Sequence, residues 1–138
     1  MKNTLAERGI FMNKALEKTF TVTEDKLAVN VGSGSLRVLA TPSVIAMMEN
    51  TAAELAAAEL ADGITTVGTA ISVEHTAPTP FGAEVTARAV LKNSDGRTFE
   101  FAVELCDRGG VVARGTHTRV SVKAEKFQKK ADGKFDEI

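Results

Sequence analysis

The sequence predicts an α+β fold in which an antiparallel sheet wraps around one long helix. Residues 41–60 place apolar side chains around most of the circumference of a helix, which is typical of a helix buried on several sides. From residue 65 onward the apolar period changes to two, which indicates strands, and polar turn sequences separate them. One buried helix followed by long consecutive strands is the pattern of an α+β domain.

The composition is that of a single globular domain. With 138 residues, 43% of them hydrophobic and 25% charged, the chain can bury one core and is too apolar to be disordered. Its formal net charge of -1 provides no general attraction for nucleic acid or an anionic membrane, so we expect neither as a partner. Cys106 is the only cysteine, and no Cys/His cluster has zinc spacing, so we expect no disulfide, metal or other cofactor.

The two ends of the chain differ from its middle. Residues 1–13 contain no apolar stretch long enough for a signal peptide or a membrane span, so we expect a cytoplasmic protein that begins with a flexible extension. The folded domain is expected over residues 14–127. Residues 128–138 form a charged tail, and we expect the stretch 124–138 to be partly disordered.

The chain before the long helix has an irregular pattern. Residues 18–22 are typical of a short strand, and residues 25–30 of a possible second one. Residues 32–35 read Gly-Ser-Gly-Ser, which predicts a mobile loop.

The long helix has recognisable start and stop signals. Thr41 can cap its first turn through the side-chain hydroxyl, and Pro42 suits the first helical position. The helical pattern continues to about Leu60, and Gly63 ends it. We therefore expect one helix of about five turns, buried on most sides.

Four strands are expected after the helix, over residues 65–76, 84–92, 98–107 and 111–123. Two polar turns, around residues 93–96 and 107–110, connect the last three of them as antiparallel neighbours. In the first strand the predicted apolar face consists of Val67, Ile71, Val73 and His75, and the predicted polar face of Thr66, Gly68, Ser72 and Glu74.

Two residues of the helix have both a structural and a chemical interpretation. Glu49 follows two methionines inside the apolar run, where an ionised carboxylate is costly unless it is paired or faces a cavity. It either meets solvent on a narrow polar strip with Asn50 and Glu54, or it is a general base or nucleophile. Thr41 is either a plain helix cap or a hydroxyl beside a reacting carbonyl.

The strands contain four further candidates. His75 ends its strand on the apolar side and is either a core histidine or a functional one. Gly68 interrupts the same strand, which marks a bulge or lets a ligand approach the backbone, where the N–H could bind an oxyanion. His117 and Arg119 share one face of the last strand, and this pattern favours a half-exposed strand surface over a functional pair.

Several common chemistries lack their usual sequence signatures. Phosphate-binding and dinucleotide-binding glycine patterns, the nucleophile elbow of serine hydrolases and the zinc-protease motif are all absent from the sequence. Cys106 has no base nearby in the sequence, and we expect it to be inert. Glu, His and Thr are the remaining candidates for catalysis.

Four stretches of the chain resemble the fluoroacetyl-CoA thioesterase family and its hot-dog-fold relatives. The stretches are Gly68-Thr69-Ala70-Ile71, His75-Thr76-Ala77-Pro78-Thr79-Pro80, Gly115-Thr116-His117 and Glu125-Lys126-Phe127, and Met48-Glu49 fits as well. The similarity extends over residues 41–127. It implies a hot-dog fold, which agrees with the helix and sheet predicted from the pattern alone, and an acyl-CoA substrate.

The resemblance also implies roles for particular residues. By motif match, Thr41, Glu49 and His75 act on the thioester, while Gly68 and Arg119 line the substrate. Glu49, assisted by His75, would activate water or form a transient acyl adduct, with Thr41 orienting the group and the Gly68 N–H stabilising the oxyanion. The sequence leaves water attack and acyl-enzyme formation as open alternatives.

The spacing within the helix adds a geometric constraint. Thr41 and Glu49 are eight residues apart, about 12 Å along a straight helix, so one chain cannot bring them into direct contact. A shared site needs a second subunit or an approaching loop, and hot-dog enzymes of this type place the site at a dimer interface. We therefore expect a homodimer.

The alternatives to a thioesterase are a non-catalytic hot-dog protein that binds acyl-CoA or another small apolar ligand at the dimer interface, and, less favoured, an enoyl-CoA hydratase.

The fluoroacetyl-CoA enzyme of the family carries phenylalanines in a lid before its central helix. Residues 24–40 of this chain contain no aromatic residue, so we expect a broader enzyme for short or medium acyl-CoAs.

Overall fold

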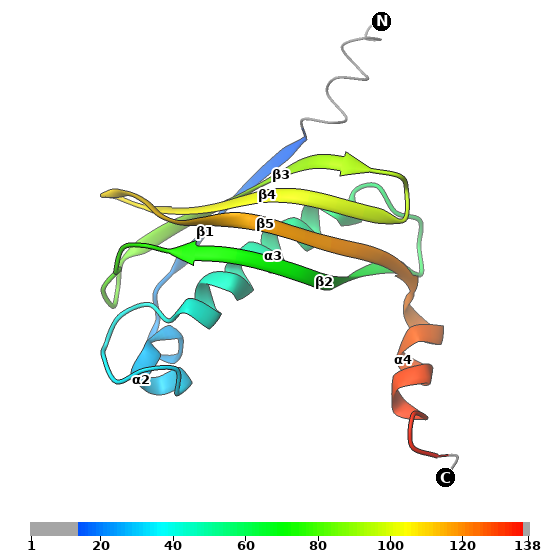
Figure 1. The fold of residues 1–138 in the computed structure, drawn as a ribbon, viewed down its shortest axis with the longest axis horizontal. Coiled ribbons are helices and arrows are strands. Elements are labelled where there is room, and N and C mark those ends of the chain that lie inside the picture. Colours follow the sequence, from blue (N-terminus) through cyan, green and yellow to red (C-terminus); the bar gives the residue numbers. More distant parts are fainter. Residues whose placement is uncertain (1–13, 137–138) are drawn as a thin grey trace, which may run out of the picture.

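A computed structural model describes residues 14–136 of the chain (Figure 1). The elements in chain order are β1 (Ala15–Thr21), the 3₁₀ helix η1 (Glu24–Lys26), α2 (Ala28–Val31), α3 (Thr41–Ala57), β2 (Ile64–His75), β3 (Glu84–Ser94), β4 (Thr98–Asp107), β5 (Gly110–Lys123) and α4 (Ala124–Asp132). The predicted flexible extension, residues 1–13, lies outside the described residues. No helix within residues 14–136 is long and apolar enough to cross a membrane.

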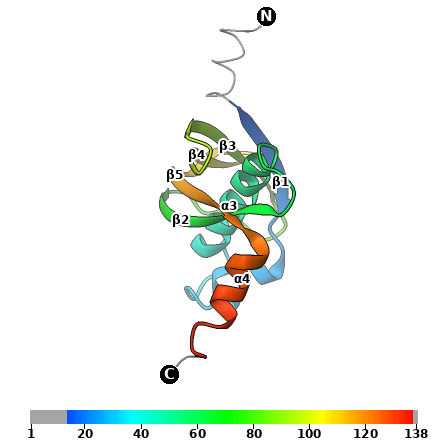
Figure 2. The ribbon, with the colours of Figure 1, turned by 90° about the vertical axis from the view of Figure 1, so that its right-hand side faces the viewer.

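The five strands form one antiparallel sheet in the order β1-β3-β4-β5-β2, and α3 lies across one face of it (Figure 2). This arrangement confirms the predicted α+β fold with a sheet around a central helix. β1 and β2 are the edge strands. Because β2 has 12 residues, its outer edge presents a long row of backbone groups to a further strand.

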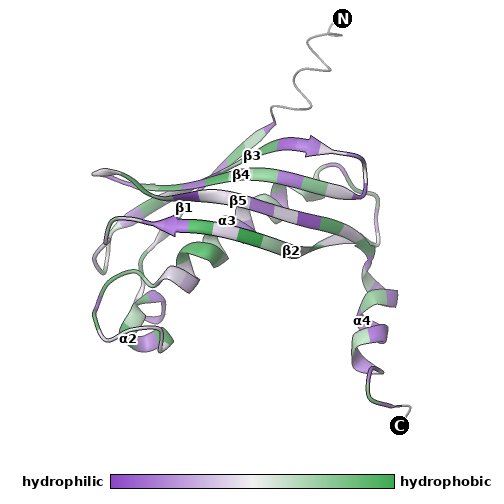
Figure 3. Ribbon diagram, in the orientation of Figure 1, coloured by the Kyte–Doolittle hydropathy of each residue, from purple (hydrophilic) through white to green (hydrophobic). Residues whose placement is uncertain are grey.

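The core lies between α3 and the face of the sheet that α3 covers. β3 and β4 alternate buried and more exposed residues, as predicted, and hydrophobic and hydrophilic positions follow one another along the strands (Figure 3). The largest fully buried side chains include Phe99, Phe101, Leu39, Met48, Leu105, Val44 and Val85. Burial of this apolar surface is the main force that fixes the helix on the sheet.

Helix α3 begins at Thr41 as predicted but ends at Ala57, before Leu60. The last turn tightens because the amides of Glu59 and Leu60 donate to carbonyls only three residues back. Gly63 then adopts a left-handed φ of 83° in the turn that leads into β2.

One exposed strip of α3 is polar. Lys18 on β1 donates to Asn50 Oδ1 at 2.6 Å and to Glu54 Oε1 at 2.7 Å. Glu49 is on a different side of the helix and takes no part in this strip.

Two segments differ from the sequence-based expectations. Residues 25–30, expected as a possible strand, belong to η1 and α2, where the Leu27 amide donates to the Glu24 carbonyl at 3.2 Å and closes a helical turn. Residues 124–132, expected to be partly disordered, form α4. Charges spaced one turn apart suit a helix, and the Glu125 and Lys129 side chains lie 3.9 Å apart.

A β-bulge interrupts β2. The pairing of β2 with β5 shifts between Gly68 and Ala70, so the side chains change face at that point. Thr66 and Gly68 face the helix before the bulge, and His75 faces it after the bulge. The predicted faces of β2 are therefore correct beyond the bulge and wrong before it, where Thr66 rather than Val67 is buried.

Candidate active site

Thr41 and His75 form a hydrogen-bonded pair. Thr41 Oγ1 lies 2.8 Å from His75 Nδ1, and either atom can donate depending on the imidazole tautomer. The backbone brings them together, because the Leu39 amide donates to the Thr79 carbonyl at 2.9 Å and holds the chain before α3 beside the chain after β2. The expectation that the Thr41 hydroxyl caps the helix is wrong. Ala40 is the N-cap residue, and no side chain caps this end of α3.

The second ring nitrogen of His75 is the unusual atom of this pair. His75 Nε2 is buried and has no hydrogen-bond partner within residues 14–136. A buried imidazole nitrogen normally finds a partner, because leaving it unpaired costs about 1–3 kcal/mol. Nε2 can therefore pair only with a group that residues 14–136 do not supply.

Glu49 faces the sheet beside the bulge. Its Oε2 lies 3.7 Å from Arg119 Nη1 and 3.9 Å from His117 Nε2, and its side chain remains 41% exposed. A Cβ placed on Gly68 would lie 2.6 Å from Glu49 Oε2, closer than any real side chain could come. Glu49 is therefore partly exposed but lies outside the strip that Lys18 binds, and glycine at position 68 leaves room for the carboxylate beside the strand.

The Arg119 guanidinium is buried and held on three sides. Its Nε donates to Thr66 Oγ1 at 2.8 Å, and its Nη2 donates to the Thr66 carbonyl at 3.0 Å. Its Nη1 is thereby directed at Glu49 and His117. Burial lowers the pKa of Arg119 below its usual value, and the Glu49 carboxylate partly opposes this effect.

His117 and Arg119 are 2% and 8% exposed, so the expectation of a half-exposed strand surface is wrong. His117 Nδ1 lies 2.8 Å from the Ala70 carbonyl oxygen. Burial is the main cause of a lowered His117 pKa, and the Arg119 charge adds to it, while the Ala70 hydrogen bond and Glu49 oppose it. The sequence analysis weighed His117 as a candidate but favoured a structural role for it, and it did not consider Thr66, which binds the Arg119 guanidinium. The shared face of His117 and Arg119 on β5 was the available signal.

The candidate residues form two groups within one chain. Thr41 and His75 make one group, and Glu49, Gly68 and Arg119 make the other. The two groups lie beside different parts of α3, because Thr41 and Glu49 are separated by about 12 Å along the helix. One chain therefore holds the candidate residues in two separate groups.

Cys106 is a free, partly buried cysteine at the end of β4. Burial raises the pKa of the Cys106 thiol, and the nearby carboxylates of Glu104 and Asp107 raise it further, so its reactive thiolate is disfavoured. Among residues 14–136, no group of three or more His, Cys, Asp or Glu side chains is arranged to hold a metal ion.

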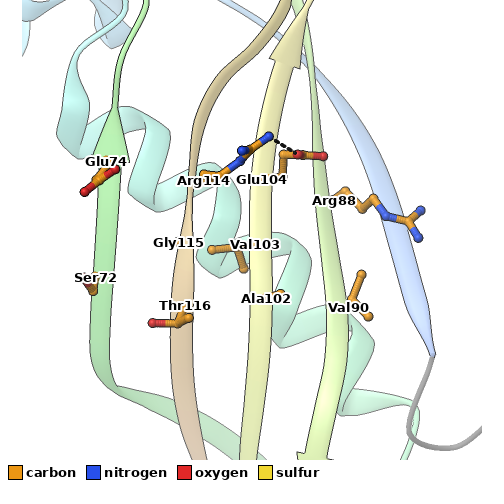
Figure 4. Close-up of a pocket in the computed structure, with 10 residues that line it drawn as sticks. All are labelled: Ser72, Glu74, Arg88, Val90, Ala102, Val103, Glu104, Arg114, Gly115 and Thr116. Atoms are coloured by element: carbon orange, nitrogen blue, oxygen red, sulfur yellow. Dashed lines mark hydrogen bonds and ion pairs between the residues drawn. The ribbon is translucent and has the colours of Figure 1, made fainter.

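The opposite face of the sheet carries a row of alternating charges beside a hollow of about 490 Å³ (Figure 4). The row crosses all five strands in register as Glu17, Arg88, Glu104, Arg114 and Glu74. Arg88 contacts Glu17 at 3.1 Å and Arg114 contacts Glu104 at 3.3 Å. These exposed ion pairs contribute little stability, and the residues that line this hollow include none of the candidate site residues.

Comparisons with known proteins agree on one family. A family model described as fluoroacetyl-CoA-specific thioesterase matches residues 22–125. The fluoroacetyl-CoA thioesterase of Streptantibioticus cattleyicolor is 38% identical over 93 residues, which cover 67% of this chain and 67% of that protein.

Solved structures show the same fold. A structure of the fluoroacetyl-CoA thioesterase FlK superposes with a TM-score of 0.84 at 30% identity, covering 89% of this chain and 96% of that one. A threonine-to-serine variant of FlK in complex with acetyl-CoA gives a TM-score of 0.85 at 30% identity, covering 90% and 98% of the two chains. A hot-dog-like protein from Thermanaerovibrio acidaminovorans gives 0.80 at 22% identity, covering 90% and 92%. The predicted hot-dog fold is thus confirmed.

Proposed function

Because the chain belongs to the family of fluoroacetyl-CoA-specific thioesterases, we propose that it hydrolyses short and medium acyl-CoA thioesters with Glu49 and His75 as its catalytic pair. Membership of the family makes the chain a thioester hydrolase. The observation that carries the catalytic assignment is the position of Glu49, whose carboxylate lies against Gly68 and Arg119 instead of on the solvent strip.

In this proposal Glu49 acts on the thioester carbonyl. Its carboxylate either takes a proton from water or attacks the carbonyl carbon to form a transient acyl adduct that water then hydrolyses. Both routes place negative charge on the carbonyl oxygen. The Gly68 N–H donates to that oxygen, and the nearby Arg119 charge stabilises the anionic state.

Thr41 and His75 serve the same carbonyl from the other side. The Thr41 hydroxyl orients the His75 ring through the 2.8 Å contact with Nδ1, which leaves the buried Nε2 without a partner within residues 14–136. His75 Nε2 exchanges a proton with the attacking water or with the departing CoA sulfur. A thiol with an ordinary pKa of about 8.5 leaves readily as a thiolate, so protonation of the leaving group is a modest requirement.

Each of the two groups of candidate residues is half of a site. A homodimer that pairs the outer edges of β2 joins the two half-sites. Residues directly opposite each other in an antiparallel pair face the same side of the sheet. A two-fold axis at Ser72 meets this condition for two β2 strands, and with the extra residue of the bulge it would place Gly68 opposite His75 of the partner subunit. Glu49 of one subunit then shares a site with Thr41 and His75 of the other. The same pairing covers the long exposed edge of β2.

The acyl range follows from the segment before α3, residues 24–40. Its exposed large hydrophobic side chains are aliphatic: Val29, Val31 and Leu36, with Leu36 67% exposed. Phe81 lies beside this segment, but the Arg37 guanidinium covers its ring at 5.7 Å from the centroid, so it does not make a dry aromatic lid. A segment with small and aliphatic side chains over the acyl group suits several acyl groups.

Thiol release from a panel of acyl-CoAs tests the proposed function. Purified protein should release free CoA from acetyl-CoA and from longer acyl-CoAs, and Glu49→Gln should not. Binding of acyl-CoA without thiol release by the wild-type protein would instead identify a non-catalytic binding protein.

A further inference from the structure

His117 is the buried polar side chain of the site for which the proposed chemistry has no use. It extends from β5 into the space between Gly68, Glu49 and Arg119, and it is 2% exposed. A Cβ on Gly68 would lie 3.1 Å from His117 Cε1, so the imidazole packs directly against the backbone beside the bulge. Its ring stacks on Phe101 of β4, with centroids 6.1 Å apart and planes 28° apart.

The two hydrogen bonds of His117 determine its tautomer. Nδ1 lies 2.8 Å from the Ala70 carbonyl oxygen, which can only accept, so Nδ1 carries a hydrogen and donates. Nε2 lies 3.2 Å from Arg119 Nη1, which can only donate, so Nε2 carries a lone pair and accepts. The ring is therefore neutral, with its hydrogen on Nδ1.

Each of these hydrogen bonds reaches a group that the reaction needs. Ala70 is the residue where β2 resumes its pairing after the bulge, so the bond to its carbonyl holds the backbone next to Gly68 in its displaced path. Arg119 is already held at Nε and Nη2 by Thr66, and the bond to His117 fixes the remaining end of the planar guanidinium, which faces Glu49.

We propose that His117 is a positioning residue of the active site, a neutral ring that holds the bulge at Gly68 and the Arg119 guanidinium in place around Glu49. It exchanges no proton with the substrate, because both nitrogens are occupied within the chain. This inference rests on the proposed function, since it concerns the same carboxylate.

Substitution of His117 by Phe and by Asn tests this role. His117→Phe keeps the ring contact with Phe101 but has no polar atom, and we expect its kcat for acetyl-CoA to fall about ten- to a hundredfold with little change in KM, the scale for a displaced catalytic geometry. His117→Asn retains an N–H that can donate to Ala70 and should recover part of that loss. Thr116→Val, on the exposed face of the same strand, is the matched control and should keep the wild-type kcat.

The pH profile separates positioning from proton transfer. If His117 only positions its neighbours, the kcat profile of His117→Asn keeps the inflections of the wild type at a lower plateau. A lost inflection would make His117 a proton-transfer group and overturn the proposal. Wild-type kcat in a folded Phe or Asn variant would overturn it too, as would nitrogen NMR shifts that place the hydrogen of the wild-type ring on Nε2.

Glu49→Gln, assayed in parallel, distinguishes a failure of the His117 proposal from a failure of the proposed function. If Glu49→Gln loses activity and the His117 variants do not, the proposed function stands and the role of His117 is wrong. If Glu49→Gln remains active, the catalytic assignment of Glu49 in the proposed function fails, and the inference about His117 falls with it.

Discussion

His75 and His117 are the two histidines of the chain, and both face α3 from the sheet, but their hydrogen bonding differs. His117 uses both ring nitrogens inside its own chain, on Ala70 and Arg119. His75 uses Nδ1 on Thr41 and has Nε2 without a partner in the part of the chain that the structure describes. A histidine with both nitrogens occupied can hold its neighbours, whereas one with a buried open nitrogen is suited to act on something else.

The largest expected effect tests the half-site that His117 supports. Glu49→Gln removes the charge and the basicity of the carboxylate with almost no change of shape, and kcat for thioester hydrolysis should fall at least about a hundredfold. The assay is thiol release under saturating substrate, with circular dichroism to check the fold. Glu54→Gln, on the solvent strip that Lys18 binds, is the control. Wild-type turnover by a folded Glu49→Gln protein would contradict the assignment.

His75→Ala directly tests the histidine whose Nε2 has no partner in the described residues. We expect a loss of turnover on the same scale as for Glu49→Gln, about a hundredfold, because the general acid-base group is removed. Thr41→Val should have a smaller effect, since it removes only the group that orients the ring. A His75→Ala protein with full activity and a lowered Tm would show that His75 is a core histidine instead.

Mixed dimers test whether the two half-sites belong to different subunits. Glu49→Gln and His75→Ala chains, mixed and reassembled in equal amounts, should recover about a quarter of the wild-type activity. Half of the dimers are then mixed, and each of these has one intact site of two. The measurement is activity before and after reassembly. No recovery despite mixed dimers, or a monomer in sedimentation at micromolar concentration, would contradict the shared site.

Substrate preference tests how far the aliphatic segment before α3 limits selectivity. The ratio of kcat/KM for fluoroacetyl-CoA to that for acetyl-CoA should stay below about 200, since one small group in an apolar pocket contributes about 1–3 kcal/mol. Both substrates are measured under identical conditions. A ratio far above a thousand would show that selectivity survives without an aromatic lid.

The smallest expected effect concerns stability and depends on His117, the histidine with both ring nitrogens hydrogen-bonded. Glu49 from α3 and Arg119 from β5 are the charged groups that face His117, and its pKa in the fold lies below the ordinary 6.5. As pH falls through about 6.5 the unfolded chain binds a proton that the folded chain does not, so the free energy of unfolding decreases. The contribution is at most about 1.4 kcal/mol per pH unit.

Urea unfolding between about pH 7.5 and pH 5.5 measures this contribution. The wild-type protein should lose more stability over that range than His117→Gln, which has no titrating ring. Equal pH dependence of the two proteins would show that His117 titrates alike in the folded and unfolded states.

The sequence by itself determined the fold and most of the candidate residues. Alternation over β3 and β4 and the apolar run of α3 predict the layers, because each pattern can bury its apolar side in only one way. Local patterns failed to predict the structure of segments for which several conformations have similar free energies. Residues 25–30 are short and irregular, and residues 124–132 have a charged pattern that suits a solvated helix as well as a tail.

Only the tertiary structure decided the chemistry around those residues. Gly68 suggested a bulge in the sequence, but the alternation of side chains along β2 could not show that the bulge turns Gly68 toward Glu49. Nor can the sequence of β5 show that His117 and Arg119 are buried, because burial depends on what packs over a strand. The two histidines differ for the same reason: hydrogen bonding to Thr41, Ala70 and Arg119 is a contact between distant segments, which local spacing does not encode.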